Sequence, residues 1–556
     1  MICFRYCPGH ASNTYFSPAK RIKQNRVTPL FAPMATFPTS PVNTEPHVDS
    51  CVTTPTTAVD EYPGFSKSSS PPGLGPNVPD FDFDLERTIP PTNSRRTLIL
   101  CFDGTGDQFD DANSNVINFF TMLKKDVKSQ QLVYYQAGIG TYSIPEIAQP
   151  ELAKLHRALD AMLGSHLNAH VMGGYEFLMQ NYQHGDKICL FGFSRGAYVS
   201  HGKLFILSDS AVHKTARALA GMLHKVGLLP KCNHQQVPFA YKMYSREDET
   251  GWRQSTAFKK AFSIDVDIEL IGVWDTVSSM GFVPRTLPFT RSNNNVRYFR
   301  HAIALDEHRA RFQPNFWNRP TPDDLQLGVQ PGEMPKSGRK PFKKKSLNDL
   351  ENQYMDGGQY QTHVEEVWFA GCHCDVGGGA LPNATRNSLA RIPLRWMIRQ
   401  CFLLDTGILF HGELLRLVGM DPDTLYPRVL PRPPPLLRSP QESQINTMTK
   451  APSLFECDFR NEEEEEWADA LSSINDELKR RKVWWILEIL PQKLRYQEND
   501  DSWTQKLDVH RGRGRHIPRQ STHGVKIHRS VKMRMEAIGY HPKANLKPTT
   551  VPTWVD

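Results

Sequence analysis

A Gly-x-Ser-x-Gly motif directly follows a short apolar run, and this feature constrains the fold more than any other. The run is KICLF at 187–191 and the motif is GFSRG at 192–196. A buried strand that turns sharply into a helix exposes the central serine hydroxyl, and the two glycines relieve steric clashes around the turn. We therefore predict a strand–turn–helix with Ser194 as a nucleophile. The alternative is a glycine-rich turn without chemistry.

Apolar runs alternate with helix-like stretches through the middle of the chain. Helices are predicted at about 113–126 and 151–182, the second with a break at Gly173-Gly174. Strands separated by helices imply a mostly parallel sheet covered on both faces, so we predict an α/β fold. The predicted strands lie at 96–102, 132–135, 187–191, 266–273 and 364–370.

Composition divides the chain into four segments. Fifteen of the 42 prolines lie in the first 91 residues, which predicts a disordered tail over 1–93. A catalytic domain is predicted over 94–420, and a polar, basic stretch at 318–360 indicates a surface insertion within it. A proline-rich linker at 421–460 and a helical C-terminal appendage at 461–556, packed on the catalytic domain, complete the chain. The acidic run within this appendage, residues 462–466, is expected to form the N-terminal face of a helix.

Charge and cysteine content exclude several classes of protein. Lys+Arg minus Asp+Glu is 66 − 59 = +7, with no stripe of basic and aromatic residues, so we predict no nucleic-acid partner. Ten irregularly spaced cysteines favour a reducing compartment, and no apolar run approaches a membrane span. A cytoplasmic location is therefore expected. The first 44 residues lack Asp and Glu, which resembles a mitochondrial transit peptide, and disorder is the preferred interpretation.

A serine nucleophile needs a base, and the base needs an acid that orients it. Asp275 follows the strand predicted at 266–273, and His373 follows the strand predicted at 364–370. Both side chains would lie at the carboxyl edge of a parallel sheet, in the chain order Ser, acid, His. We predict the triad Ser194, Asp275 and His373. Asp375 is the rival acid and His528 the rival base.

The negative oxygen of an acyl-transfer intermediate needs two N–H donors. One is expected from Arg195, the residue after the nucleophile, and the other from Gly104 or Thr105 after the first strand. The Asp103 side chain in the same loop has a simpler interpretation, which is to stabilise a turn.

A second chemistry is compatible with the same strand ends. Asp103, Asp110, Asp275 and Asp375 would suit Mg²⁺ or Mn²⁺ in a metal-dependent phosphohydrolase, but that reaction leaves Ser194 without a role. Zinc at Cys372-His373-Cys374 is disfavoured, because alternating residues do not converge on one ion. The third alternative is a catalytically inactive scaffold that keeps the fold.

Taken together, six segments resemble the family of type VI secretion phospholipase effectors, which is α/β-hydrolase-like. The resemblance spans about Arg96 to Asp405, and later segments KVWWILEILP and VKIHRSVKMRM resemble a mainly fungal branch. It implies the Ser194, Asp275 and His373 triad and suggests a phospholipid substrate. The six segments are FDGTGDQFDDANSNV, VYYQAGIGT, GFSRGAY, ARALAGMLHKVGLL, GVWDTV and WFAGCHCDVGGG.

Sixteen residues, Val199 to Lys214, interrupt this pattern directly after GFSRGAY. Without them Tyr198 joins Thr215 and a continuous helical pattern results. Val199 codons begin with GT and Lys214 can end in AG, so we predict a retained intron; a genuine insertion loop is the alternative. Because the insertion falls in the helix that should follow the nucleophile, this chain is expected to be weakly active or inactive.

We therefore predict a serine ester hydrolase, lipase- or phospholipase-like, that needs no cofactor. Its partner is expected to be a small-molecule or lipid ester. Peripheral membrane contact through the lysines at 336–345 is a further option.

Overall fold

The computed structural model describes residues 87–104, 107–138, 165–193, 215–277, 287–290, 292–293, 295–318, 350–351, 361–437, 461–499 and 502–556. Predictions for residues 1–86, 199–214 and 319–349 fall outside these ranges and stay predictions. No helix in the described ranges is long and apolar enough to cross a membrane.

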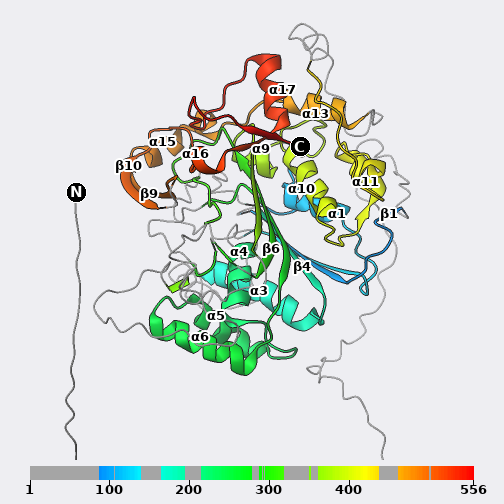
Figure 1. Cartoon of the computed structure of the whole chain (residues 1–556), viewed down its shortest axis with the longest axis vertical. Helices are drawn as coiled ribbons and strands as arrows, with labels where there is room; N and C mark the ends of the chain where they lie inside the picture. Colours follow the sequence, from blue (N-terminus) through cyan, green and yellow to red (C-terminus); the bar gives the residue numbers. More distant parts are fainter. Residues whose placement is uncertain are drawn as a thin grey trace, which may run out of the picture. The chain divides into compact units, whose positions relative to one another are not determined.

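The described residues form an eight-stranded sheet in which every neighbouring pair is parallel (Figure 1). The strand order is β12-β11-β7-β6-β5-β4-β2-β3. This confirms the predicted α/β fold. The strands are β2 (Thr97–Phe102), β3 (Gln131–Gln136), β4 (Lys187–Phe193), β5 (Ile268–Trp274), β6 (Val296–Ala304), β7 (His363–Phe369), β11 (Lys526–His528) and β12 (Thr553–Val555).

Both faces of the sheet are buried, which explains why its central strands are apolar runs without alternation. All six residues of β2 are buried. Leu98, Leu100 and Phe102 enter one core, whereas Ile99 and Cys101 enter the other. Successive side chains of a strand point to opposite faces, so a strand buried on both sides is mostly apolar along its length.

Helices cover the two faces. The helices α1 (Asn115–Met122) and α10 (Arg391–Leu403) pack together on one face, and α3 (Ser165–Asn181) and α4 (Thr215–Val226) pack together on the other. Every residue of α4 is buried, because α5 (Val237–Ser245) and α6 (Glu249–Phe262) pack on its outer side. Figure 1 shows α3 to α6 gathered on one side of the sheet and α1 and α10 on the other.

The chain order changes direction at β2. The crossover from β2 leads to β3 on one side and the crossover from β4 leads to β5 on the other, so the crossovers leave these two neighbouring strands in opposite directions. In open parallel sheets ligands bind beyond the carboxyl ends of the strands at such a switch point. The residues that follow these two strand ends are Asp103 and Ser194.

The C-terminal segment belongs to the same sheet. It contains helices, as predicted, but it also adds β11 next to β7, and β12 next to β11. These three-residue strands are too short to show an apolar period. The segment further contains a hairpin of β9 (Pro491–Gln497) and β10 (Trp503–Val509), and the helices α13 (Glu462–Ala470), α14 (Glu477–Arg480), α15 (Trp485–Glu488), α16 (Gln520–His523) and α17 (Arg529–Ile538).

Buried ion pairs join α13 to α10. As predicted, the acidic run begins a helix, capped by Asn461. Asp469 pairs with Arg391 and Arg395, and Glu462 pairs with Arg399. Arg432, in the region predicted as a linker, also pairs with glutamates of α13, and Pro422 and Leu425 of the same region are buried.

Three details differ from the sequence predictions. The helix α3 continues through Gly173-Gly174 without a break. Glycine at position 174 leaves room for Phe102, because a Cβ there would approach the phenyl ring within 2.7 Å. The strand β6 went unpredicted because Arg300 and His301, both buried, interrupt its apolar pattern. The fold also begins before residue 94, because β1 (Thr88–Ile89) pairs with β8 (Phe410–His411).

Candidate active site

Asp275 is the first residue after β5, and it is fully buried. Its backbone adopts φ = 40°, a left-handed conformation that is uncommon for a residue with a side chain. Its backbone N–H donates to the Ala302 carbonyl at 2.7 Å, and Oδ1 accepts from the Ala304 N–H at 2.9 Å. These contacts with β6 fix the carboxylate at the carboxyl edge of the sheet.

His373 begins the short helix α9 (His373–Gly377) after β7, and it is also fully buried. Its Nδ1 donates to Oδ2 of Asp275 at 2.6 Å. Burial lowers the pKa of His373 below its ordinary value, although Asp275 opposes this shift. The imidazole is therefore neutral at pH 7, with its proton on Nδ1 and Nε2 left as the acceptor.

Arg515 holds the other side of Asp275. Its Nη1 donates to Oδ1 at 2.6 Å and its Nη2 donates to Oδ2 at 2.9 Å, and both side chains are fully buried. Burial raises the pKa of Asp275, but the charge of Arg515 and the hydrogen bond from His373 outweigh it, so this pKa lies well below its usual range. Asp275 is therefore ionised throughout the range in which the protein is expected to work.

A second buried ion pair lies against the same histidine. Glu307 accepts from the backbone N–H of His373 at 3.2 Å and pairs with Arg309 at 2.8 Å. Burial opposes ionisation of Glu307, yet the charge of Arg309 lowers its pKa to about 2. The guanidinium of Arg309 in turn lies 3.5 Å from the Phe312 ring centroid.

The imidazole of His373 lies between two aromatic rings. The ring centroids of Phe193 and Phe312 are each 4.9 Å from it. Phe193 packs directly on α9, where a Cβ at Gly377 would lie 1.7 Å from the phenyl ring. The Nε2 atom of His373 is buried and makes no hydrogen bond with the described residues. Ser194, which follows Phe193, lies outside the described residues, as does Arg195.

The loop after β2 has a defined structure up to Gly104. Asp103 accepts from Ser114 Oγ at 2.6 Å, from Tyr135 Oη at 2.8 Å and from the Gly104 N–H at 2.8 Å. Asp103 therefore stabilises the turn, and the Gly104 amide points at this carboxylate instead of an oxyanion. Thr105, the other predicted donor in this loop, lies outside the described residues.

The rival acid and the rival base have partners of their own. Asp375 accepts from the Cys372 N–H and from the backbone and side chain of Asn475, and burial raises its pKa to about 6. His528 caps α17 by accepting from the Ser530 N–H, and burial lowers its pKa to about 3. The structure brings neither of them to the hydrogen bond between His373 and Asp275.

The aspartates considered for a metal do not converge. Within the described ranges no three His, Cys, Asp or Glu side chains are grouped so that they would hold a metal ion. Asp275 faces a guanidinium, Asp103 faces hydroxyl and amide donors, and Asp110 is exposed. The carboxylates of Asp275 and Asp103 at the strand ends therefore accept hydrogen bonds from protein groups, such as a guanidinium, hydroxyls and backbone amides.

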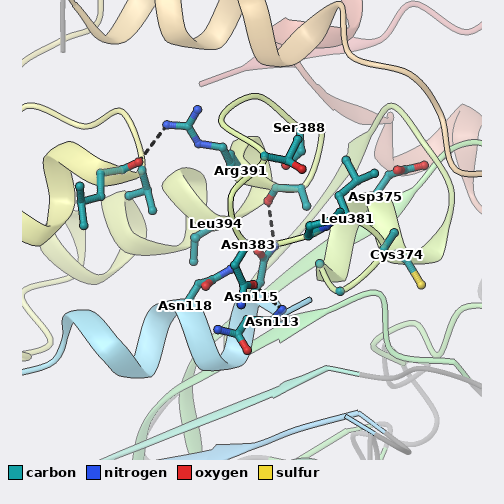
Figure 2. A pocket seen from close by; sticks show the side chains of 18 of the residues that line it. Asn113, Asn115, Asn118, Cys374, Asp375, Leu381, Asn383, Ser388, Arg391 and Leu394 are labelled. Carbon is teal, nitrogen blue, oxygen red and sulfur yellow. Dashed lines mark hydrogen bonds between the residues drawn. The ribbon is translucent and has the colours of Figure 1, made fainter. Parts of the chain in front are cut away.

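A cavity of about 300 Å³ lies next to α9, between α1 and α10. Cys374 and Asp375, which follow His373, line one side, and Asn115 and Asn118 of α1 line another (Figure 2). Leu394 of α10 adds apolar surface. The cavity therefore has both polar and apolar walls, and two of its lining residues directly follow the buried histidine in the chain.

The sequence predicted Asp275 and His373 because each follows a predicted strand, and the structure brings their side chains into a hydrogen bond. Sequence reasoning missed Arg515 and Glu307. Arg515 lies in RGRGR, which is typical of a solvated basic loop, and Glu307 follows the unpredicted β6. No local pattern marks their role in this site, because Asp275 and the His373 backbone N–H, which they contact, are 240 and 66 positions away along the chain.

Comparison with known proteins gives one family. Residues 96–400 match the family described as "T6SS, Phospholipase effector Tle1-like, catalytic domain". The uncharacterized protein YEL023C of Saccharomyces cerevisiae is 26% identical over 585 aligned residues, covering 81% of each chain. A solved structure of the Tle1 effector bound to the VgrG spike of the type 6 secretion system is 16% identical, with a TM-score of 0.21. That alignment covers 54% of this chain and about half, 53%, of the other.

Proposed function

The chain belongs to the Tle1-like phospholipase effector family through its catalytic domain, and on this premise we propose that it is a serine ester hydrolase acting on a lipid ester. The observation that carries the proposal is the buried pair of His373 and Asp275, whose remaining imidazole nitrogen makes no hydrogen bond among the described residues. The chain places Ser194 next to Phe193, whose ring packs on that imidazole. The proposed nucleophile is thus one residue from a side chain in contact with the proposed base.

In the proposed reaction, Nε2 of His373 takes the proton of the Ser194 hydroxyl while Oγ attacks the ester carbonyl carbon. The resulting tetrahedral intermediate collapses, and the alcohol leaves with the proton from Nε2. In the second half of the reaction, Nε2 of His373 takes a proton from water as the water oxygen attacks the acyl-enzyme carbonyl. It then returns that proton to Ser194 Oγ, which leaves as the carboxylic acid is released. Atoms and charge balance without a cofactor.

The electrostatics of the pair suit this role. Asp275 accepts from Nδ1, which keeps the acceptor lone pair of His373 on Nε2. When His373 takes up the serine proton, the ionised carboxylate stabilises the imidazolium. Burial keeps the histidine neutral beforehand, so it is in the basic form at neutral pH.

The oxyanion donors belong to the proposal as well. The Arg195 N–H retains its predicted role, and Thr105 is the preferred second donor, since the Gly104 amide is bonded to Asp103. The cavity next to α9 is proposed to hold a non-reacting part of the substrate. Its polar and apolar walls suit an amphipathic ester such as a phospholipid.

The test has two assays, which measure the release of fatty acid from phosphatidylcholine vesicles and the release of nitrophenol from a short-chain nitrophenyl ester. We expect weak hydrolysis or none by the full chain, stronger hydrolysis by the chain lacking 199–214, and none by Ser194→Ala in either chain. EDTA is expected to have no effect. Full activity of folded Ser194→Ala, together with loss of activity in EDTA, would contradict the serine mechanism and favour the metal-dependent alternative.

A further inference from the structure

Arg515 comes from the C-terminal segment, beyond the residues that match the family catalytic domain, yet it contacts the proposed catalytic acid. We propose that Arg515 is a positioning residue of this site, which fixes the Asp275 carboxylate and, through it, the ring of His373. For its activity readout the inference rests on the hydrolase function proposed above. It implies that the C-terminal segment is an integral part of the catalytic unit.

The geometry is that of a two-point clamp. The Arg515 fork reaches both oxygens of Asp275, and it also donates to the carbonyls of Ala304 and Phe312. With the Ala304 amide and His373, the Asp275 carboxylate receives four hydrogen bonds, two at each oxygen. A planar guanidinium holds a carboxylate in one orientation, which a lysine ammonium does not do.

The backbone around Arg515 is itself held in place. A Cβ at Gly514 would lie 1.6 Å from the Lys543 carbonyl, so only glycine allows this close approach. The Arg515 carbonyl accepts from the Asn545 N–H at 2.9 Å, and the Ala544 N–H donates to the Leu305 carbonyl at 2.9 Å. The segment is therefore fixed to the loop that follows β6, and the guanidinium position follows from that.

Arg515 also affects the charge that His373 experiences. The charged groups around the imidazole are Asp275 after β5, Glu307 and Arg309 after β6, and Arg515. The other titratable groups beside it are the thiol of Cys372, which caps α9, and the Cys374 thiol and Asp375 carboxyl on α9. Glu307 and Arg309 neutralise each other, as do Asp275 and Arg515. Without Arg515, the Asp275 charge would be uncompensated and would favour protonated His373.

The test uses the full chain with Arg515→Met, which removes the charge, and Arg515→Lys, which keeps it without the fork. Arg529→Met is the matched control, because Arg529 is a similarly buried arginine of the same segment, paired with Glu466. The readout is the NMR titration of ¹⁵N-labelled histidines, with the His373 signal identified by its absence in His373→Gln.

We expect the pKa of His373 to rise in Arg515→Met and to stay near the wild-type value in Arg515→Lys and Arg529→Met. A folded Arg515→Met protein with an unchanged or lower His373 pKa would overturn the proposal. This titration needs no enzymatic activity, so it remains decisive even if Ser194 proves unreactive.

Labelling by a fluorophosphonate probe supplies the second measurement, and it serves if Arg515→Met does not fold. Loss of the fork displaces the base, so Arg515→Lys should label roughly tenfold to a hundredfold more slowly than wild type. The pH of half-maximal labelling should stay unchanged. Wild-type labelling by Arg515→Lys would contradict the inference while leaving the hydrolase function intact. Absence of labelling in both the full chain and the chain lacking 199–214 would instead contradict the hydrolase function alone.

Discussion

At the scale of single residues, two buried aspartates near His373 differ in what they contact. Asp275 bonds to the imidazole, whereas Asp375 bonds to the backbone of Cys372 and to Asn475. We predict that Asp275→Asn slows fluorophosphonate labelling about a thousandfold or more, because the amide favours the wrong histidine tautomer. Asp375→Asn should lower the free energy of unfolding by about 1–2 kcal/mol while labelling of the folded fraction persists. The reverse pattern would make Asp375 the catalytic acid.

The pH dependence of labelling follows from the state of His373. The reaction needs the neutral imidazole, and burial lowers the pKa of His373 below its ordinary value. Labelling should therefore persist as the pH falls, with half-maximal rate below the usual histidine value of about 6.5. Asp275 adds no titration in this range, because its pKa lies well below its usual value. An acid limb centred above pH 7 would contradict this assignment.

Of the residues in this candidate site, the sequence predicted only those that directly follow a predicted strand. Asp275 and His373 were identifiable because parallel strands end at one edge. The donors that hold them were not: Arg515 and Glu307 take part through contacts across the fold, which periodicity does not report. The sequence also did not show that the Gly104 N–H, a predicted oxyanion donor, donates to the Asp103 carboxylate.

At the scale of elements, the ion pairs between α10 and α13 fix the C-terminal segment on the domain. Asp469 is fully buried and accepts from Arg395, Asn387 and the Ser388 N–H. We predict that Asp469→Ala lowers the free energy of unfolding by about 3–5 kcal/mol, because it leaves a buried arginine charge without its carboxylate. Denaturant unfolding measures this value.

The matched control for Asp469→Ala is Glu536→Ala, which removes an exposed carboxylate 3.9 Å from Lys532. The expected change is below about 1 kcal/mol. Equal effects of the two substitutions would mean that α13 contributes little to holding the segment.

The elements that the sequence predicted are those with long apolar runs. The strands β2, β4 and β5 are buried along almost their whole length, and β7 is buried over its last three residues, and their composition shows it. The strand β6 carries buried arginine and histidine side chains, and β11 and β12 have three residues each. Their places in the sheet depend on pairing with distant segments, which local composition does not contain.

At the scale of the whole molecule, the question is how the 199–214 segment affects the proposed catalytic unit. The strand β4 ends at Phe193 and α4 begins at Thr215, so 21 residues separate them; removing the segment leaves five. A nucleophile elbow joins its strand to its helix by a short turn. We predict that deletion of 199–214 raises the labelling rate of Ser194 at least tenfold, and an unchanged or lower rate would contradict the retained-intron interpretation.

Activation of Ser194 by His373 and Asp275 is tested most simply by locating the fluorophosphonate adduct by mass spectrometry, in the full chain and in the chain lacking 199–214. We expect a single adduct on Ser194 in the shortened chain, the same adduct in smaller yield or none in the full chain, and no adduct in Ser194→Ala. An adduct on another residue, or no adduct in either folded chain, would contradict the proposal that His373 and Asp275 activate Ser194.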